Sequence, residues 1–598
     1  MRLKEAWQTK GWVKLAAAVI INAVFLAFML TCFAPVYETN DDLFLSKFVD
    51  GQLSHRTIWM PYVNIVLACL IKVLYGAFGT GFPWYSFCEY LVMFCGFTAI
   101  TWVLLRRFKP APALVMTAIL LGAFGTDCYL SLNFSKPGAI GTASGMFLML
   151  YAMRNETGRV MKLSLWLGFA LALCGLAWRY ESFGVCALMM TGGCLYVLVR
   201  LWLERRGQSV RDVLRPMLRF LTPFVLLAAS ALALFAFSQW MWKRPYVKAY
   251  TEFDTARCQL VDFELPKYDS LKDVYDSIGI DENFLSMING WDFYDTKKFT
   301  KENIDTIIAA RDTEYQRKSI GECLGIFLEK CIHGFCLDRP FAGFALMLLL
   351  WLACSRRRAE DWVTLLYTLG LFFVVYMVFI YIDRYLANRI DIGIFLSMAL
   401  VITMLLDEDK LRGEPLLLLA LLCTSLFISY RMNRAYCLYD SHNTIEDKSS
   451  EKAAIETLLA DNEHFYFFTT WSIDHSLYSP LETPPAGYAD KLVQIGGWSM
   501  HHPVIEELLE SHGIENPFRD IVGREDIYII DNNIERTMKH INTYYDPDAV
   551  AVPVEPLSEE TNLKIYYIKQ ILSKKIKKFV AFCVEPFYTD DWQQIYNK

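Results

Sequence analysis

Residues 15–33, LAAAVIINAVFLAFMLTCF, decide the fold class because they contain no charge over a length that can cross a bilayer. Comparable apolar runs recur as far as residue 429, whereas residues 431–598 have the composition of a water-soluble domain. The whole chain of 598 residues is 54% hydrophobic and 20% charged. Concentration of the apolar residues in blocks predicts a polytopic α-helical membrane protein. It excludes a single globular cytosolic enzyme and a disordered chain.

The apolar blocks predict about eleven transmembrane helices with the N-terminus in the cytoplasm and the C-terminus outside. In this topology the basic loops, such as 106–109 and 356–358, all lie on the cytoplasmic side, as the positive-inside rule requires. Residues 59–78 are less clear, because Pro61, Asn64 and Lys72 interrupt them. We interpret them as a helix at the outer interface and leave a further span open. The spans are expected near 15–33, 84–105, 112–130, 139–153, 163–178, 183–203, 220–241, 340–354, 361–381, 392–406 and 415–430.

This predicted topology divides the chain into four regions. Residues 1–241 form an N-terminal transmembrane region that includes a first outer loop (35–58) and the interfacial helix (59–78). Residues 242–338 form an extracytoplasmic insert, and residues 339–430 form the C-terminal transmembrane helices. Residues 431–598 alternate strand-like runs (465–470, 492–496, 527–530, 564–568) with helix-like ones (451–460, 504–511, 533–542), which predicts an extracytoplasmic α/β domain.

The first outer loop carries an acidic cluster, Tyr-Glu-Thr-Asn-Asp-Asp at residues 37–42. Glu38, Asp41 and Asp42 repel one another and raise at least one carboxyl pKa unless a cation is close. Such a cluster fits a general base or a divalent-metal ligand. The alternative is a solvated loop in which Asn40 or Asp41 caps a helix over residues 43–49.

The other outer loops carry isolated cations, against the positive-inside trend. Lys136, Arg179, Arg384 and Arg389 lie beside aromatic residues and are suited to bind a lipid phosphate. The alternative is local pairing, Arg179 with Glu181 and Arg384 with Asp383. In the insert, the residues suited to an acceptor groove or to a structural role are Tyr250, Asp254, Arg257 and Asp262.

Some classes of function are disfavoured by composition. A net charge of −6 gives no support for nucleic-acid binding. The cysteines follow no zinc-binding spacing, and the adjacent pair His501 and His502 is a poor metal site.

The layout resembles GT-C-fold glycosyltransferases, and within them uncharacterised multi-span membrane protein families of Gram-positive bacteria. The resemblance rests on the YETNDD signature at 37–42 and on a Tyr…Phe-Asp…Ala-Arg…Asp-Phe pattern over 250–263, where Asp254 replaces an expected Asn. It implies a bacterial plasma-membrane enzyme that moves a sugar from a polyprenyl-phosphate donor to a cell-envelope glycan or other acceptor at the outer face. The mechanism would be inverting, with Asp41 or Asp42 as base. It leaves dependence on Mg²⁺ or Mn²⁺ open.

Three other functions stay open from the sequence. They are a polysaccharide polymerase, a lipid-linked-sugar flippase or transporter, and a non-catalytic envelope protein that binds a glycan. A transporter would place ionisable residues at mid-bilayer, whereas the charges noted above lie at the outer ends of the spans. The pattern therefore favours a reaction at the membrane surface.

Overall fold

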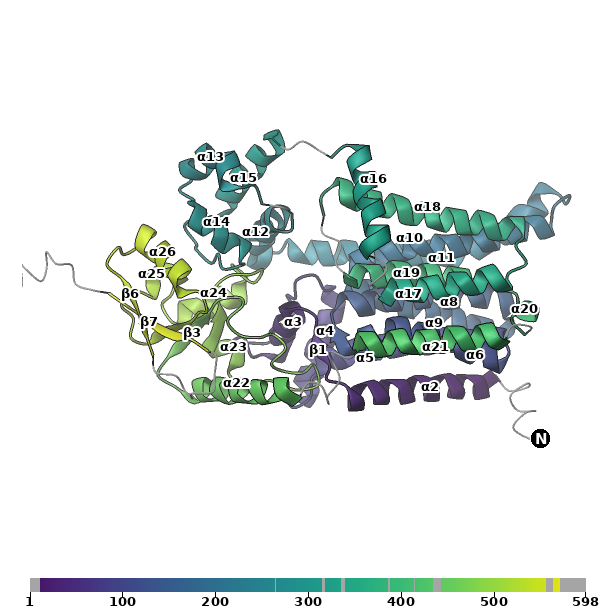
Figure 1. Cartoon of the computed structure of the whole chain (residues 1–598), viewed down its shortest axis with the longest axis horizontal. Coiled ribbons are helices and arrows are strands. Elements are labelled where there is room, and N and C mark those ends of the chain that lie inside the picture. The colour runs from purple at the N-terminus through teal and green to yellow at the C-terminus, as the bar shows by residue number, and fades with distance from the viewer. Residues whose placement is uncertain are drawn as a thin grey trace, which may run out of the picture. The chain divides into compact units, whose positions relative to one another are not determined.

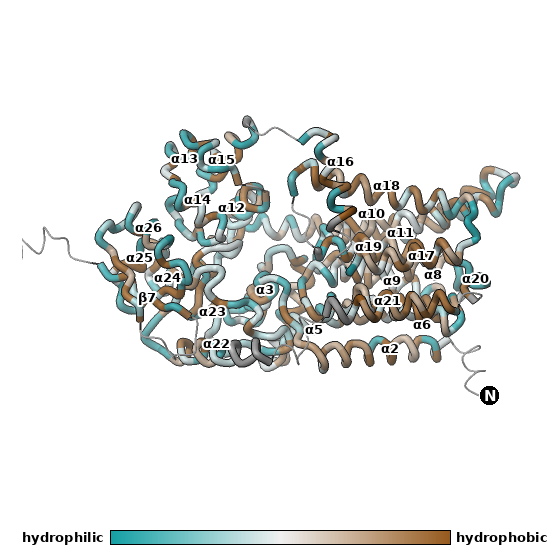
Figure 2. Tube along the Cα trace, in the orientation of Figure 1, coloured by the Kyte–Doolittle hydropathy of each residue, from teal (hydrophilic) through white to brown (hydrophobic). Residues whose placement is uncertain are grey.

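The computed structural model describes residues 11–263, 265–314, 318–334, 339–384, 388–412, 415–433, 442–554 and 563–570. The chain forms two compact units (Figure 1). The membrane unit comprises residues 1–251, 315–446 and 475–484, and the α/β unit comprises residues 252–314, 447–474 and 485–598. Figure 2 shows that hydrophobic residues follow the long helices of the membrane unit.

Seven helices among the described residues are long and apolar enough to cross a membrane. They are α2 (Gly11–Cys32), α5 (Trp84–Arg107), the continuous segment Pro110–Leu130, α9 (Gly158–Trp178), α10 (Tyr180–Glu204), α11 (Val210–Trp242) and α18 (Ala359–Tyr381). Shorter apolar helices are α4 (Ile65–Phe78), α17 (Arg339–Cys354) and the Pro415–Ser429 part of α21 (Pro415–Asn433). The chain is thus a multi-pass membrane protein, as predicted.

Two predicted spans are helices of a different character. α8 (Ser135–Asn155) and α19 (Asn388–Leu405) cover the predicted spans 139–153 and 392–406, and neither is among the seven apolar helices. Residues 135–152 of α8 are all buried, because α5, α9, α10 and α19 pack around this helix. α8 is therefore the central helix of the membrane unit.

A stripe of small residues allows α8 to approach α9 closely. A Cβ atom on Gly145 would lie 2.5 Å from the carbonyl oxygen of Gly168, and one on Gly175 would lie 2.6 Å from that of Gly138. Small residues at such spacing are a usual means of helix packing in membranes, where dispersion forces and not exclusion of water hold helices together. This packing fixes the first turn of α8, which carries Lys136.

Short elements join the helices of the membrane unit. The first outer loop contains β1 (Val36–Tyr37) and α3 (Asn40–Asp50), and β1 pairs in parallel with β2 (Ser131–Leu132). The helix predicted over residues 43–49 is present, but its N-cap residue is Thr39 instead of Asn40 or Asp41. Within 110–130, α6 (Pro110–Leu120) and α7 (Thr126–Leu130) flank the π-helical η1 (Leu121–Gly125). Further elements are α16 (Ile320–Glu329), η3 (Lys330–Gly334) and α20 (Glu408–Arg412).

The α/β unit is built on a five-stranded sheet in the order β4-β3-β5-β7-β6. β3 (Phe465–Phe468) pairs in parallel with β4 (Leu492–Gln494) and β5 (Ile527–Ile530), and β7 (Ile565–Lys569) is antiparallel to β5 and to β6 (Val550–Pro553). Its helices after β3 are α23 (Tyr488–Lys491), α24 (Pro503–Ser511), α25 (Pro517–Asp520) and α26 (Ile534–Tyr544), and α22 (His442–Ala460) precedes β3. The α/β fold predicted for the C-terminal part of the chain is therefore present.

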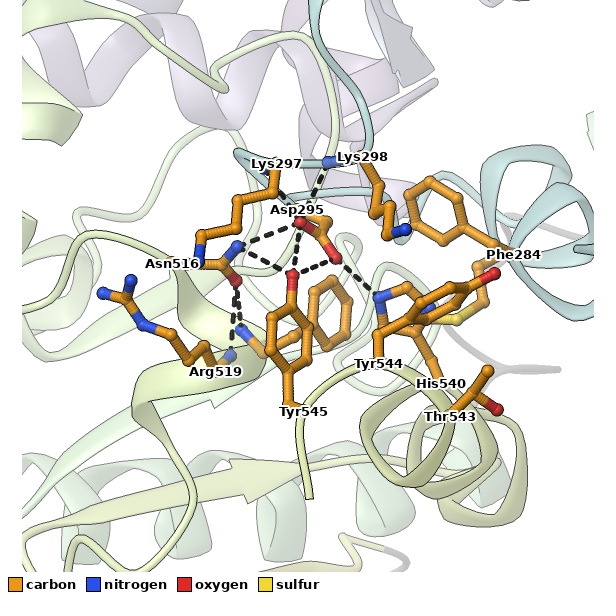
Figure 3. A network of polar contacts seen from close by, with 12 residues as sticks. Phe284, Asp295, Lys297, Lys298, Asn516, Arg519, His540, Thr543, Tyr544 and Tyr545 are labelled. Carbon is orange, nitrogen blue, oxygen red and sulfur yellow. Dashed lines mark hydrogen bonds and ion pairs between the residues drawn. The ribbon is translucent and has the colours of Figure 1, made fainter. Parts of the chain in front are cut away.

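Residues 252–314 of the insert belong to the same compact unit as the sheet. Their elements are the end of α12 (Pro245–Val261), η2 (Tyr268–Leu271), α13 (Lys272–Ser277), α14 (Glu282–Asn289) and α15 (Lys301–Glu314). Asp295 of the insert is buried in a polar network (Figure 3). It accepts hydrogen bonds from His540 Nε2 at 2.7 Å, from the Tyr545 hydroxyl at 2.6 Å and from Asn516 Nδ2 at 2.9 Å. This carboxylate thus joins the insert to the C-terminal part of the chain.

We expect Asp295→Ala to lower the free energy of unfolding of the α/β unit by about 3–5 kcal/mol at neutral pH, because it leaves buried donors without an acceptor. Burial by itself raises the pKa of Asp295, but the hydrogen bonds from His540 and Tyr545 hold it below its usual value. The stabilisation is therefore present above the usual carboxyl pKa, and it is lost as the pH falls through the lowered value.

Urea-dependent protease cleavage of the purified protein, measured at neutral and acidic pH, checks this expectation. Asp305→Ala is the matched control, because Asp305 lies half-exposed on α15 and pairs only with Lys301 at 2.5 Å among the contacts described. A similar response of the two variants would contradict a central role of Asp295.

Candidate active site at the first outer loop

The β1–β2 pair brings the acidic first loop beside the start of α8. Glu38 follows β1, and its backbone N–H donates to the carbonyl oxygen of Leu132 at 2.7 Å. Lys136 lies four residues beyond that carbonyl, in the first turn of α8. A two-residue parallel ladder thus places Glu38 next to a lysine that is about a hundred residues away in the sequence.

Lys136 is the centre of the polar cluster that results. Only 1% of its side chain is exposed, and its Nζ lies 2.8 Å from Glu38 Oε2 and 2.8 Å from Asp127 Oδ2. It also donates to the carbonyl oxygen of Ser131 at 2.5 Å. Asp127 lies on α7, directly after the π-helical segment 121–125, and such segments are frequent at functional sites.

The cluster continues on both sides as a row of alternating charges. Arg389 Nη1 lies 3.4 Å from Glu38 Oε1, and Arg339 Nη1 lies 4.0 Å from Asp127 Oδ1. The row is thus Arg389, Glu38, Lys136, Asp127 and Arg339. We call these five residues the charge row.

Each cation of the charge row lies in the first turn of its helix, Lys136 on α8, Arg339 on α17 and Arg389 on α19. The helix dipole disfavours a cation at this position and favours an anion. Three helix N-termini and three cations therefore create a positive potential that Glu38 and Asp127 balance only in part. Such a site is suited to bind a phosphate group.

Asp41 and Asp42 lie in the first turn of α3 but in different surroundings. Asp42 is fully buried, and its Oδ1 accepts from the Tyr85 hydroxyl at 2.8 Å and from the backbone N–H of Phe134 at 2.9 Å. Burial, together with the charge of Asp41, raises the pKa of Asp42 to about 7. Asp41 is only partly buried, and its Oδ2 accepts from the Thr39 hydroxyl at 3.0 Å.

Arg179 lies against the same loop segment as Lys136. Its guanidinium is 4.7 Å from the ring centre of Phe134 and 5.1 Å from that of Tyr62, and it pairs with Glu181 at 2.8 Å. Tyr62 has a φ of 67°, which is strained for a residue with a side chain. The local pair of Arg179 with Glu181 is thus present, and the aromatic contacts hold the same guanidinium beside Phe134.

Arg384 is not part of the cluster in the described segments. Its side chain is exposed. Among the residues that the structure describes, Arg384 forms no ion pair and no side-chain hydrogen bond. The alternative pairing with Asp383 is also not observed, because Asp383 pairs with Lys318.

The candidates of the insert lie in two separate environments. Tyr250 is buried with Trp242 and Val247 in the membrane unit. In the α/β unit, Arg257 is buried, lies 2.7 Å from Asp254 and 3.9 Å from Asp262, and stacks over Trp291 at 5.5 Å. Burial raises the pKa of Asp254. These contacts fit a structural role in the α/β unit.

Sequence reasoning missed Asp127, Arg339 and Glu89. Asp127 and Glu89 are acidic residues inside predicted spans, and Arg339 directly precedes one. The available signal was the cost of an ionisable group in an apolar helix, which makes such a residue a candidate for function.

The described carboxylates do not form a metal site. Among the residues that the structure describes, no group of three or more His, Cys, Asp or Glu side chains is arranged to hold a metal ion. Instead, Glu38 contacts two cations and Asp42 Oδ1 two donors. The donor set therefore does not fit a divalent cation, and no step is assigned to one.

No protein-family model and no curated protein matches the chain. Two solved structures match over nearly the full length. ArnT from Cupriavidus metallidurans in the apo state has 10% sequence identity and a TM-score of 0.50, and the match covers 94% of this chain and 98% of ArnT. The chain has the GT-C fold. ArnT bound to undecaprenyl phosphate matches with 11% identity and a TM-score of 0.37, over 93% of this chain and 98% of that one.

The GT-C fold confirms the resemblance at the level of fold. The narrower resemblance to Gram-positive families through YETNDD stays a prediction. The assignments of individual site residues stay predictions as well, and their support is the geometry of the charge row and of α3.

Proposed function

We propose that this protein is a glycosyltransferase that moves a sugar from a polyprenyl-phosphate donor to an acceptor at the outer face of the membrane. The observation that carries the proposal is the charge row beside the carboxylates of α3. A cluster rich in cations next to a partly exposed acidic residue matches what this reaction requires, namely a group that stabilises the leaving phosphate and a base.

The charge row is our proposed site for the donor phosphate. Arg389 and Arg339 are able to bind phosphate oxygens bidentately, whereas buried Lys136 acts as a fixed point charge. The negative charge on the leaving phosphate grows as the glycosidic bond breaks, so preorganised cations stabilise the transition state more than the ground state. Arg179, beside Phe134, is a further contact for the donor.

Asp41 is our proposed base. Both carboxylates of α3 were candidates from the sequence, but Asp42 is enclosed and has two donors on one oxygen, whereas Asp41 is partly exposed. Asp41 would take the proton of an acceptor hydroxyl as its oxygen attacks the anomeric carbon. The bond from that carbon to the phosphate oxygen breaks, and the configuration inverts. Glu38 would position Lys136 and Arg389.

Transfer of a labelled sugar from synthetic polyprenyl-phosphate donors by the purified protein in lipid nanodiscs tests this function. Product should form with the wild-type protein and disappear with Asp41→Asn. A protein that moves the lipid-linked sugar across vesicles without transferring it would be a flippase, and that result would contradict the proposal.

We propose further that the charge row and residues 442–570 lie outside the cell. The basic loops 106–109 and 356–358 are at the opposite ends of the helices from α3, and short basic loops favour the cytoplasm (Figure 1).

Cysteine labelling of intact cells tests this orientation. A membrane-impermeant maleimide should label Lys539→Cys, which is exposed on α26, and should spare Lys109→Cys until the cells are opened. Since native cysteines are present, labelling of each variant is compared with that of the wild-type protein. Labelling of Lys109→Cys from outside would contradict the proposed topology.

A further inference from the structure

We propose that Glu89 and Asp42 share one proton, and that Glu89 is a positioning residue that holds the carboxyl group of Asp42 beside Asp41 in the first turn of α3. The role of this pair in transfer rests on the proposed function, whereas the proton sharing itself does not. Glu89 belongs to α5 and has no part in the mechanism derived above.

Helix geometry places Glu89 against the first outer loop. Residues three or four apart on a helix lie on the same face. Tyr85, four residues before Glu89, donates to Asp42 at 2.8 Å, and Ser86, three residues before it, lies 2.8 Å from the hydroxyl of Tyr37. The face of α5 that carries Glu89 is therefore the face that meets Tyr37 and Asp42, so the carboxyl groups of Glu89 and Asp42 are near enough to act on each other electrostatically.

The two carboxyl groups lack the donors that two ionised carboxylates would need. Glu89 and Asp42 are both 0% exposed. Among the described residues, neither oxygen of Glu89 has a hydrogen-bond donor, and neither has Oδ2 of Asp42. Two unsolvated charges in one buried cluster would repel strongly, and each oxygen without a donor would be costly. One proton held between the carboxyl groups supplies the missing donor and removes one charge.

The surrounding groups do not neutralise the pair in another way. Lys136 is a cation that acts on Glu89, but its Nζ already contacts Glu38 and Asp127 at 2.8 Å each. Arg389 acts on Asp42 and contacts Glu38 at 3.4 Å. The titratable and charged groups that face the pair are Asp41 on α3, Tyr37 on β1, Tyr85 and Tyr90 on α5, Lys136 on α8 and Arg389 on α19. The tyrosines are neutral at physiological pH and leave the count of one proton unchanged.

The shared proton has a consequence for the base. A proton shared between Asp42 and Glu89 lowers the negative charge beside Asp41 in the first turn of α3. The cluster then also carries one negative charge fewer when the donor phosphate binds. Burial and the charge of Asp41 raise the pKa of Asp42 to about 7, so a proton on Asp42 is lost as the pH rises above neutrality.

Infrared spectroscopy of the purified protein tests the proton sharing without any transfer assay. The wild-type protein at pH 6 should show the carbonyl band of a protonated, buried carboxylic acid, which weakens as the pH rises. The band should be weaker in both Glu89→Gln and Asp42→Asn than in the wild-type protein, and should keep its intensity in Asp41→Asn. An undiminished band in Glu89→Gln and Asp42→Asn, or its absence from the wild-type protein, would overturn the inference.

Transfer measured against pH tests the positioning role. Glu89→Gln supplies an N–H in place of the shared proton, so it should keep transfer within about threefold of wild type at neutral pH and lose the decline at higher pH. Glu89→Leu supplies no donor and should reduce transfer about tenfold or more. A Glu89→Gln profile identical to that of the wild-type protein would contradict the role, even if Glu89→Leu failed to fold.

The two measurements separate the two proposals. If the infrared result is as expected but no variant or wild-type sample transfers sugar, the proposed function fails and the proton sharing stands. If the wild-type protein transfers sugar but the infrared band does not depend on Glu89, only the inference fails.

Discussion

Asp41→Asn is expected to reduce the rate of sugar transfer by about 10²- to 10⁴-fold, the usual contribution of a general base. The amide of Asn accepts the hydrogen bond from Thr39 as the carboxylate does, so the first turn of α3 should keep its geometry. The amide is not basic and leaves the acceptor hydroxyl protonated during attack. Initial rates with saturating donor, measured for proteins of equal thermal stability, check this expectation.

Two variants control the Asp41 measurement. Asp409→Asn makes the same chemical change at an exposed site in α20 and should leave transfer within about twofold of wild type, as for most surface substitutions. Asp42→Asn keeps the acceptor of the Tyr85 and Phe134 hydrogen bonds and should be less harmful than Asp41→Asn. If Asp41→Asn transferred sugar normally while Asp42→Asn did not, Asp42 would be the base.

Lys136→Met is expected to lower the free energy of unfolding by about 3–5 kcal/mol, because it leaves Glu38 and Asp127 without the cation that lies between them. The methionine fills a similar volume, so the loss reflects mainly charge. The same substitution should also reduce transfer by about 10²- to 10³-fold, the usual effect of removing one preorganised group that stabilises a developing anion. Thermal unfolding in nanodiscs and initial transfer rates measure the two effects.

A second substitution separates the two roles of Lys136. Asp127→Asn in the Lys136→Met background removes one of the two unpaired carboxylates and should restore much of the stability. Transfer should stay low, because the donor phosphate still lacks its central cation. Full recovery of transfer in the double variant would show that Lys136 is only structural. In the wild-type protein, transfer should be unchanged by EDTA or added Mg²⁺, since Lys136 occupies the place where the acidic residues would hold a cation.

Local sequence patterns were sufficient to predict most of the secondary structure. Each span predicted between residues 112 and 430 coincides with a helix of the membrane unit. This prediction is possible because the length and hydrophobicity of a span are properties of the segment itself. In the α/β unit four strands were predicted and β6 was missed. β6 is short and lies at the edge of the sheet, and it ends at Pro553, so it carries little of the usual signal of a strand.

Local sequence patterns did not indicate which residues pair with the site residues. The sequence indicated that Lys136 and Arg389 have unusual charges for an outer loop, and that Glu38, Asp41 and Asp42 are candidates for chemistry. It did not indicate that Asp127 and Arg339 complete the charge row, or that Arg384 does not join it in the described segments. An ion pair forms between two segments that are close in space, and the separation of these segments along the chain does not indicate that they are close.

By itself, therefore, the sequence determined that this is a multi-pass membrane protein with an α/β domain and an acidic first loop, because hydropathy and strand or helix propensity act over short stretches. Only the tertiary structure decided which charges belong together. The β1–β2 ladder sets Glu38 beside Lys136, and the close packing of α8 on α9 fixes the turn that carries Lys136. The docking of α3 on α5 encloses Asp42 with Glu89 and leaves Asp41 accessible, since burial and pairing are set by contacts between segments far apart in the chain.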